Sequence, residues 1–119
     1  MITVTPAVDI VEVPKPWGRE LWWANAEHYM GKTLEIRAGH STSLHYHQRK
    51  HETLLLLTGA VTVQDGDLET ALLPGDAIMI DPWTVHRIRA AQDSTLVEVS
   101  TGHRGDVVRV EDAYGRVLT

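Results

Sequence analysis

The chain has 119 residues and no cysteine, and its 16 acidic and 11 basic residues give a formal net charge of −5 at pH 7. This length suits one small domain with a single core. The lack of cysteine excludes disulfides, thiolate ligands and a cysteine nucleophile. Acidic and basic residues are mixed along the chain, so we expect no nucleic-acid partner and no basic membrane anchor.

The N-terminus carries no targeting signal that we can recognise. Its first residues, MITVTPAVDI, lack the positive start and apolar core of a signal peptide. No apolar run approaches the ~20 residues of a membrane span. We therefore expect a cytoplasmic protein.

The first quarter of the chain, residues 1–31, predicts strands around a turn. Residues 2–13 are rich in β-branched side chains and contain Pro6, which favours one or two short edge strands. Lys15-Pro16-Trp17-Gly18 predicts a rigid turn. The strand expected at 19–24 places Trp22 and Trp23 on opposite faces. We expect one of these two rings to fill the core and the other to cover an interface or a barrel mouth.

Residues 32–100 predict a barrel of short strands. The strands are expected at 32–38, 43–48, 52–58, 60–64, 68–73, 77–80, 86–90 and 95–100. Turns rich in Gly, Pro and Asp separate them, and Asp65-Gly66 predicts a hairpin. No long stretch has the period of a helix, so we expect a single all-β domain, a sandwich or barrel. Residues 101–119 predict a final short strand and an arm.

A cluster of histidines lies between Gly39 and Gly59. His45 and His47 are two residues apart, so both point to the same face of an extended strand. Glu52 opens the next strand and His86 opens a later one. If these strands are neighbours, three imidazoles and one carboxylate converge, which is a ligand set for one divalent ion, Zn, Mn, Fe, Ni or Co.

The alternative is that the histidine pair holds no metal, since this spacing also occurs on exposed strands. Three other histidines, His28, His40 and His103, have no comparable neighbours and are interpreted as surface residues. His51 lies next to Glu52, so we expect it to face away from that carboxylate.

These spacings resemble the cupin superfamily. Gly39, His45, His47, Glu52 and Gly59 match its first signature at every defined position. The second signature is similar from Gly75 to His86, with three departures: Asp81 replaces a usual proline, Trp83 a usual glycine and Ala90 a usual asparagine. The resemblance implies a cupin jelly-roll barrel.

A narrower resemblance covers residues 15–116. Lys15-Pro16-Trp17-Gly18, Thr84-Val85-His86-Arg87, Leu96-Val97-Glu98-Val99, Asp106-Val107-Val108-Arg109 and Tyr114-Gly115-Arg116 are similar to the isomerase domain of type II phosphomannose isomerases. In that family the position of His45 is often glutamine. The resemblance implies a metal-dependent isomerase that acts on a sugar phosphate such as mannose 6-phosphate.

Four further residues have roles that this chemistry would need. Glu98 is a candidate base, because a carboxylate among apolar strand residues needs a reason to be there. It could equally orient a ligand histidine or pair with a cation. Lys50 is a second catalytic candidate, and Lys15 and Arg116 are candidates for binding the phosphate.

Two other functions remain open from the sequence. The same ligand set would serve a metal-dependent dioxygenase or related oxidoreductase, because it leaves two positions of an octahedron free. A sugar-binding cupin without turnover is the non-enzymatic alternative.

The strand at 52–58 bears on assembly. If Glu52, Leu54 and Leu56 face inward, then Leu55 and Leu57 face outward, although an exposed face is usually polar. A second protomer or the N-terminal strands would cover it, and we expect a homodimer.

Overall fold

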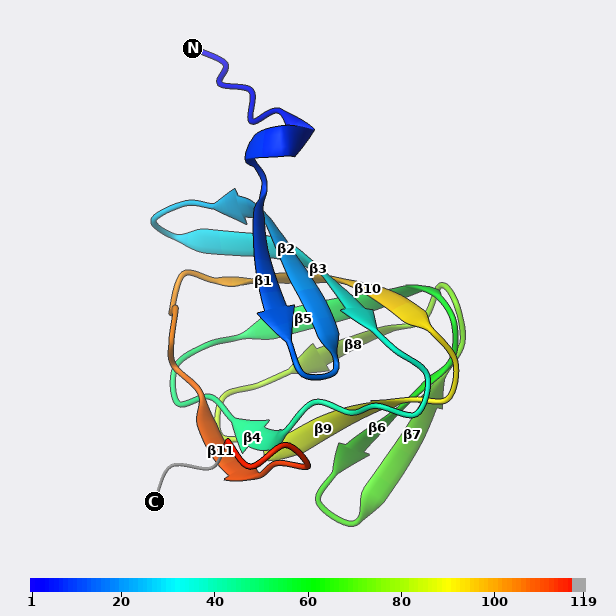
Figure 1. The fold of residues 1–119 in the computed structure, drawn as a ribbon. Helices are drawn as coiled ribbons and strands as arrows, with labels where there is room; N and C mark the ends of the chain where they lie inside the picture. The colour runs from blue at the N-terminus through cyan, green and yellow to red at the C-terminus, as the bar shows by residue number, and fades with distance from the viewer. Residues whose placement is uncertain (117–119) are drawn as a thin grey trace.

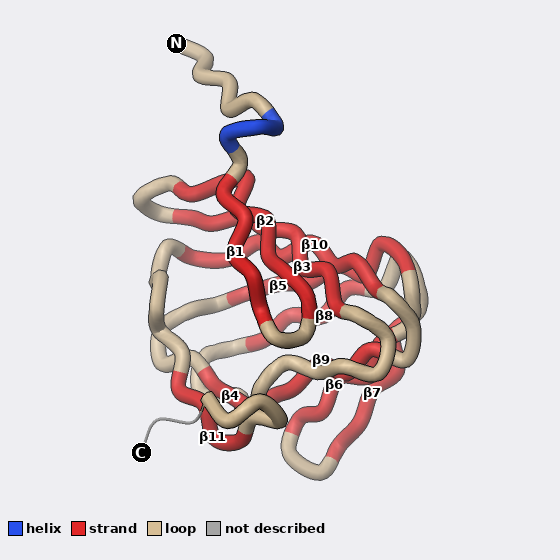
Figure 2. The backbone as a smooth tube through the Cα atoms, in the orientation of Figure 1, coloured by secondary structure: helices blue, strands red, loops and turns tan. Residues whose placement is uncertain are grey.

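The computed structural model describes residues 1–116 as two facing antiparallel sheets, seen in Figures 1 and 2. The first sheet contains, in order, β1 (Val11–Lys15), β2 (Gly18–Asn25), β3 (Tyr29–Ile36), β10 (Ser94–Thr101), β5 (Glu52–Thr58) and β8 (Ala77–Ile80). The second contains β11 (Val108–Glu111), β4 (Leu44–Tyr46), β9 (His86–Ala90), β6 (Val61–Asp65) and β7 (Leu68–Leu72). The predicted all-β barrel is confirmed.

Period-2 alternation divides the barrel interior into a polar end and an apolar end. On several strands the inward residues begin with a titratable side chain and continue with apolar ones. These runs are Glu52, Leu54 and Leu56 on β5, His86, Ile88 and Ala90 on β9, Lys32, Leu34 and Ile36 on β3, and Glu98 followed toward the apolar end by Leu96 on β10. The apolar end forms the core, and the polar end forms the candidate site.

The tryptophan that fills the core is Trp17. It is 3% exposed and packs in the main apolar cluster, where the tight turn between β1 and β2 carries it. The expectation that Trp22 or Trp23 fills the core was wrong. Trp22 lines the pocket, and Trp23 lies on the outer face over Gly31, where a Cβ would come within 2.5 Å of the indole ring.

The N-terminal region contributes one edge strand. Residues 7–9 form a single 3₁₀ turn, and β1 follows it at the sheet edge, where Pro14 is tolerated. The chain before β1 projects from the barrel (Figure 1). Strands β1 to β3 extend the first sheet sideways, so the suggestion that they cover Leu55 and Leu57 was wrong. Within residues 1–116, the longest helical segment is this 3₁₀ turn, which is far too short to cross a membrane.

Local turns explain how the strands of the second sheet connect. The hairpin between β6 and β7 has Gly66 in the left-handed region, with φ 58°, as predicted for Asp65-Gly66.

The strand expected at 43–48 is shorter than predicted and covers only β4. Strand β11 confirms the final strand, and the last residues of the predicted arm, 117–119, lie outside the described residues.

Candidate metal centre

Strands β4 and β9 bring three histidines together. His45 is the direct cross-strand partner of His86, and directly opposite residues project from the same face of a sheet. His47 lies two residues beyond His45. One ligand atom from each of the three rings lies within 4.8 Å of the others.

The backbone orients all three rings in the same way. The Nδ1 atom of each ring faces a carbonyl oxygen, which can only accept a hydrogen bond. The acceptors are Ser43 O for His45 at 2.8 Å, Asp106 O for His47 at 2.5 Å and Thr84 O for His86 at 2.8 Å. Each Nδ1 therefore donates, and each Nε2 turns its lone pair toward the centre, as in histidines that bind metal.

Glu52 adds a fourth acceptor. Its Oε1 atom lies 3.2 Å from His86 Nε2 and 3.8 Å from His47 Nε2. Lone pairs that converge in a buried space require a cation between them, either a proton or a metal ion. Three imidazole nitrogens and one carboxylate oxygen fit a divalent first-row metal. The residues predicted as ligands, His45, His47, Glu52 and His86, thus fit this group.

The electrostatics of the four groups agree with cation binding. Burial, and then the neighbouring charge of His86, lowers the pKa of His45 to about 3, so this ring stays neutral and available as a ligand. Burial alone would raise the pKa of Glu52. The contact with His86 and the charge of Lys50 outweigh burial and lower it, so Glu52 stays ionised.

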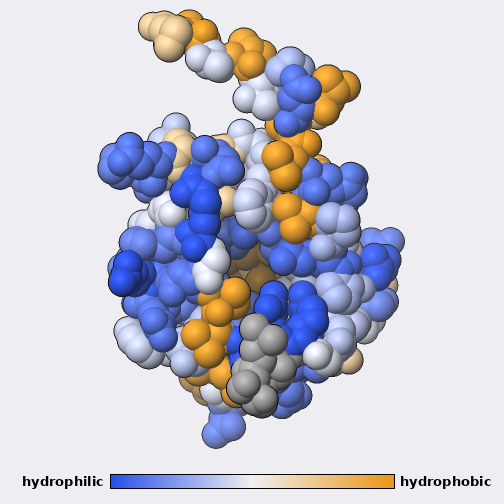
Figure 3. Space-filling view, turned by 60° about the vertical axis from the view of Figure 1, so that its left-hand side comes forward, coloured by the Kyte–Doolittle hydropathy of each residue, from blue (hydrophilic) through white to orange (hydrophobic). Residues whose placement is uncertain are grey.

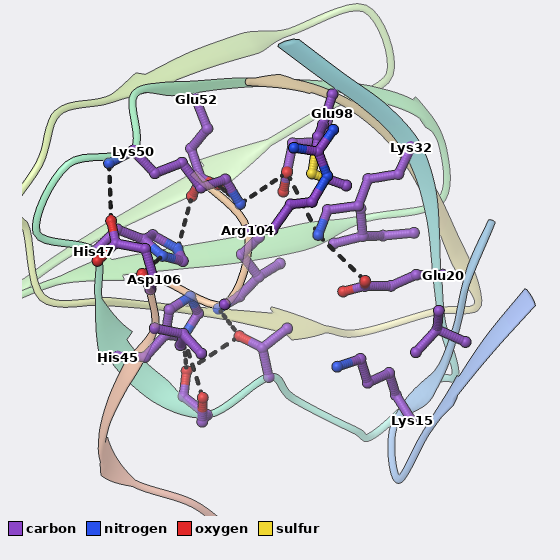
Figure 4. Close-up of a pocket in the computed structure, with 18 of the residues that line it drawn as sticks. Lys15, Glu20, Lys32, His45, His47, Lys50, Glu52, Glu98, Arg104 and Asp106 are labelled. Atoms are coloured by element: carbon purple, nitrogen blue, oxygen red, sulfur yellow. Dashed lines mark hydrogen bonds and ion pairs between the residues drawn. The ribbon is translucent and has the colours of Figure 1, made fainter. Parts of the chain in front are cut away.

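A chain of alternating charges leads away from Glu52 across the pocket (Figure 4). Lys50 Nζ lies 2.9 Å from Glu52 Oε2 and 3.0 Å from Glu98 Oε2. Lys32, the cross-strand partner of Glu98, lies 3.6 Å from Glu98 and 3.2 Å from Glu20. The two predicted catalytic residues, Glu98 and Lys50, are therefore buried, paired and adjacent to a metal ligand.

Glu98 and Lys50, neighbours in this charge chain, both have shifted pKa values. Burial, and then the nearby charge of Glu52, raises the pKa of Glu98. Burial would lower the pKa of Lys50, but Glu98 and Glu52 raise it. A carboxyl whose pKa moves toward neutrality beside a permanent ammonium is suited to accept and return a proton.

Asp106 supports the centre and was missed as a site residue. Its carbonyl oxygen orients His47, and its carboxylate accepts the backbone N–H groups of Gln48, Arg49 and Lys50 at 3.2, 2.7 and 3.0 Å. Desolvation would raise the pKa of Asp106, but the N–H donors of Arg49 and Lys50 lower it. The only signal in the sequence was its place in the motif that ends at Arg109.

The polar end of the barrel is a cavity of about 330 Å³, which suits a small ligand. Figure 3 shows the molecule hollowed on one face, with both hydrophilic and hydrophobic residues around the opening. Both predicted phosphate-binding residues, Lys15 and Arg116, line this cavity. Arg116 is held by Asp112, with Nε 2.7 Å and an Nη atom 3.1 Å from its carboxylate.

The remaining histidines lie outside the ligand cluster. His51 is exposed and faces Asp81, as expected. His40 is half-buried, and its Nδ1 lies 2.8 Å from the hydroxyl of Tyr114, so its interpretation as an ordinary surface residue was incomplete. His103 lines the cavity and lies 2.9 Å from the hydroxyl of Thr101.

Several known proteins are similar to this chain in sequence. A family model described as a cupin domain matches residues 32–102. Mannose-1-phosphate guanylyltransferase of Escherichia coli (strain K12) is 31% identical over 113 residues, which cover 89% of this chain and 23% of that protein. Xanthan biosynthesis protein XanB of Xanthomonas campestris pv. campestris (strain B100) is 27% identical over 110 residues, 88% of this chain and 24% of that protein.

Solved structures with low sequence identity share the fold. KdgF from Halomonas sp. superimposes with a TM-score of 0.77 at 21% identity, covering 87% of this chain and 98% of that one. The polyketide cyclase RemF from Streptomyces resistomycificus gives a TM-score of 0.76 at 19% identity, covering 95% and 88%.

The chain spans about a quarter of the length of the two curated relatives described above. The matches confirm both predicted resemblances, to the cupins and, more distantly, to the isomerase domain of type II phosphomannose isomerases. The chain therefore belongs to the cupin family.

Proposed function

We propose that this protein is a metal-dependent aldose-ketose isomerase that acts on a sugar phosphate such as mannose 6-phosphate. The observation that carries the proposal is the buried Lys50–Glu98 pair, 3.0 Å apart, which adjoins Glu52 in the candidate metal centre. The relatives named for mannose 1-phosphate support a sugar substrate.

The reaction moves a proton between C1 and C2 of the sugar. A divalent ion held by His45, His47, Glu52 and His86 would supply charge stabilisation for the enediol-like transition state. Glu98 takes the proton from one carbon and returns it to the other, while the hydroxyl proton passes between O1 and O2. Lys50 holds the Glu98 carboxylate in place and opposes the rise of its pKa that burial causes.

An oxygen-using oxidoreductase is the alternative that the same four ligands allow. The acid-base pair next to the centre favours proton transfer, because isomerisation requires no change in oxidation state. A sugar-binding protein without turnover would need no base in contact with the ligand.

The test begins with metal analysis of untreated protein. Protein loaded with the metal found is then incubated with mannose 6-phosphate in heavy water. Isomerisation should yield fructose 6-phosphate with solvent deuterium at the exchanged carbon and no oxygen uptake. Glu98→Gln should lower turnover at least about 100-fold while keeping the metal, whereas Glu69→Gln, an exposed carboxylate, should not. Binding without exchange in the native protein would support the non-catalytic alternative.

We further propose that the whole chain is one domain that works as a homodimer in the cytoplasm. Leu55 and Leu57 on β5 share the outer face of the first sheet with Val97 and Val99 on β10, and Val97 is the direct partner of Leu55. Leu57 and Val99 are 47% and 51% exposed. A second copy packed there would bury this apolar surface.

A further inference from the structure

Arg109 lies in the same cross-strand row as two of the candidate metal ligands. On β11 it is the direct partner of His45, which in turn is the direct partner of His86 on β9. Side chains that are directly opposite one another project from the same face of a sheet. Arg109 therefore extends over the inner face beside the metal centre, and it lines the cavity.

The guanidinium of Arg109 has unused donors. Its Nε atom is buried and has no hydrogen-bond partner in the part of the chain that the structure describes. A buried donor without an acceptor is unfavourable, so such a group in a cavity indicates an acceptor supplied by a ligand.

The other arginines of the cavity are already engaged. Arg116 is paired with Asp112. Arg104 donates to Asn25 and to the carbonyl oxygens of Gly102 and Ala26. These contacts engage both side chains, whereas the Nε atom of Arg109 has no partner within residues 1–116.

The charge of the cavity supports an anionic ligand. Six Lys or Arg side chains and four Asp or Glu side chains line it, a net charge of +2 with neutral histidines, in a chain of net charge −5. A divalent ion would add to this excess. Lys32 and Lys50 are paired with the buried carboxylates of Glu20, Glu52 and Glu98, so the positive excess lies among the cations outside these pairs, which include Lys15 and Arg109.

Lys15 and Arg109 approach the same space from different sheets. Lys15 ends β1 in the first sheet, and Arg109 lies on β11 in the second. Burial lowers the pKa of Lys15, and the positive charges of Lys32 and Arg109 lower it further, against the opposite effect of Glu20. Two cations that repel one another across a cavity are stabilised by an anion between them.

We propose that Arg109, together with Lys15, binds the oxyanion group of the ligand whose sugar oxygens reach the metal centre. The inference rests on the proposed function for the sugar, but the oxyanion could be a phosphate ester or a carboxylate. A planar guanidinium presents parallel N–H donors to two oxygens of either group. Arg109 thus fixes which end of the sugar faces Glu98.

Equilibrium binding to the metal-loaded protein tests this without turnover. The probes are mannose 6-phosphate, glucuronate and mannose, titrated by calorimetry against the native protein, Arg109→Gln, Arg109→Lys and the control Arg49→Gln, whose side chain is exposed. We expect Arg109→Gln to weaken binding of the anionic probe at least about tenfold and to leave binding of mannose unchanged. Arg109→Lys should give an intermediate loss, and Arg49→Gln none.

Metal content and thermal unfolding, measured for each variant, establish that the site next to His45 is intact. A preference of the native protein for mannose 6-phosphate over glucuronate identifies the phosphate as the ligand group, and the reverse identifies the carboxylate. The inference is overturned if neither anion binds the native protein more tightly than mannose, or if Arg109→Gln binds all three probes normally. Anion binding that depends on Arg109 without isomerisation would overturn only the proposed function.

Discussion

Lys50 places its ammonium group 3.0 Å from the carboxylate of Glu98, deep in the barrel where both side chains are less than 10% exposed. The same ammonium group also contacts Glu52, so one lysine is shared by two buried acids. Glu98 and Glu52 come from neighbouring strands, β10 and β5, while Lys50 precedes β5 in the loop that carries the ligand motif. The candidate base and one candidate metal ligand are therefore joined by a single side chain.

Replacing Lys50 with methionine should destabilise the protein strongly. The change leaves two buried carboxylates without their shared cation, and breaking a buried ion pair in this way typically costs about 3–5 kcal/mol. Urea unfolding at pH 7 measures the free energy of unfolding. Arg49→Met, in the same loop but exposed, should change it by less than about 0.5 kcal/mol. Equal stability of the two variants would contradict the buried pair.

His47→Ala should remove the metal from the purified protein. The substitution deletes one of the three converging imidazoles, and the remaining donors hold a divalent ion much less tightly. Elemental analysis of the protein as isolated measures occupancy. His51→Ala is the matched control, because His51 is exposed and faces away from the cluster. Full occupancy in His47→Ala would show that the ligands have been misidentified.

Asp106→Ala should loosen the loop before β5 and lower the affinity for metal. The carboxylate accepts the backbone N–H groups of Gln48, Arg49 and Lys50, and the alanine variant leaves these donors to water. We expect faster amide hydrogen exchange at these positions and at least about tenfold weaker metal binding. Asp106→Asn keeps one acceptor oxygen and should show a smaller effect. Unchanged amide hydrogen exchange in Asp106→Ala would mean that the Asp106 carboxylate does not order this loop.

Stability of the metal-free protein should fall with pH below neutrality. The pKa of His45 is lowered from 6.5 to about 3, so below pH 6.5 the unfolded chain binds a proton that the folded chain does not. This group therefore lowers the free energy of unfolding as pH decreases from 6.5 toward 3, by up to ~1.4 kcal/mol per pH unit, and has no such effect above 6.5.

Urea midpoints of chelator-treated protein at pH 7 and pH 5 measure this loss. His45→Gln cannot take up the proton, so its midpoints should differ less between the two pH values than those of the native protein. The same pH dependence in both proteins would mean that His45 is not buried in the neutral form.

Leu57→Lys combined with Val99→Lys should convert a dimer into a monomer. Both side chains are about half exposed on the outer face of the first sheet, and charges there oppose the packing of a second copy. Light scattering at micromolar concentration gives the mass in solution. Leu68→Lys, on an exposed part of β7, is the control. If the native protein is already a monomer at this concentration, the proposed homodimer is wrong.

Part of the candidate ligand set could be predicted from local geometry, whereas His86, on the distant strand β9, followed from the resemblance to the second cupin signature. Residues two apart on a strand share a face, and the spacing from His47 to Glu52 fits one short loop. The roles of Asp106 and Arg109 could not be predicted in this way. Both depend on the pairing of β11 with β4, about 60 residues away along the chain, and register between distant strands is not encoded by any short motif.

The tryptophans were misjudged for a similar reason. Alternation correctly placed Trp22 and Trp23 on opposite faces, but it gives no position along the barrel axis. Trp22 lies at the polar end, where its Nε1 donates to Glu20 at 2.9 Å, while Trp17 reaches the apolar end from the turn. Which end of the barrel a strand residue occupies is decided by the neighbouring strands rather than by its own strand.

The turn before β9 departs from the family pattern at Trp83, which replaces a usual glycine. Trp83 has φ 68°, a left-handed conformation that is unfavourable for a bulky residue. Its N–H donates to His47 O at 2.6 Å. Its ring stacks on that of Tyr46, with 5.6 Å between the ring centroids. The next residue, Thr84, supplies the carbonyl that orients His86. A solvent-facing bend is thus tied through two adjacent residues to two imidazoles in the interior, so a substitution at Trp83 would alter the spacing of the candidate ligands without removing a donor atom.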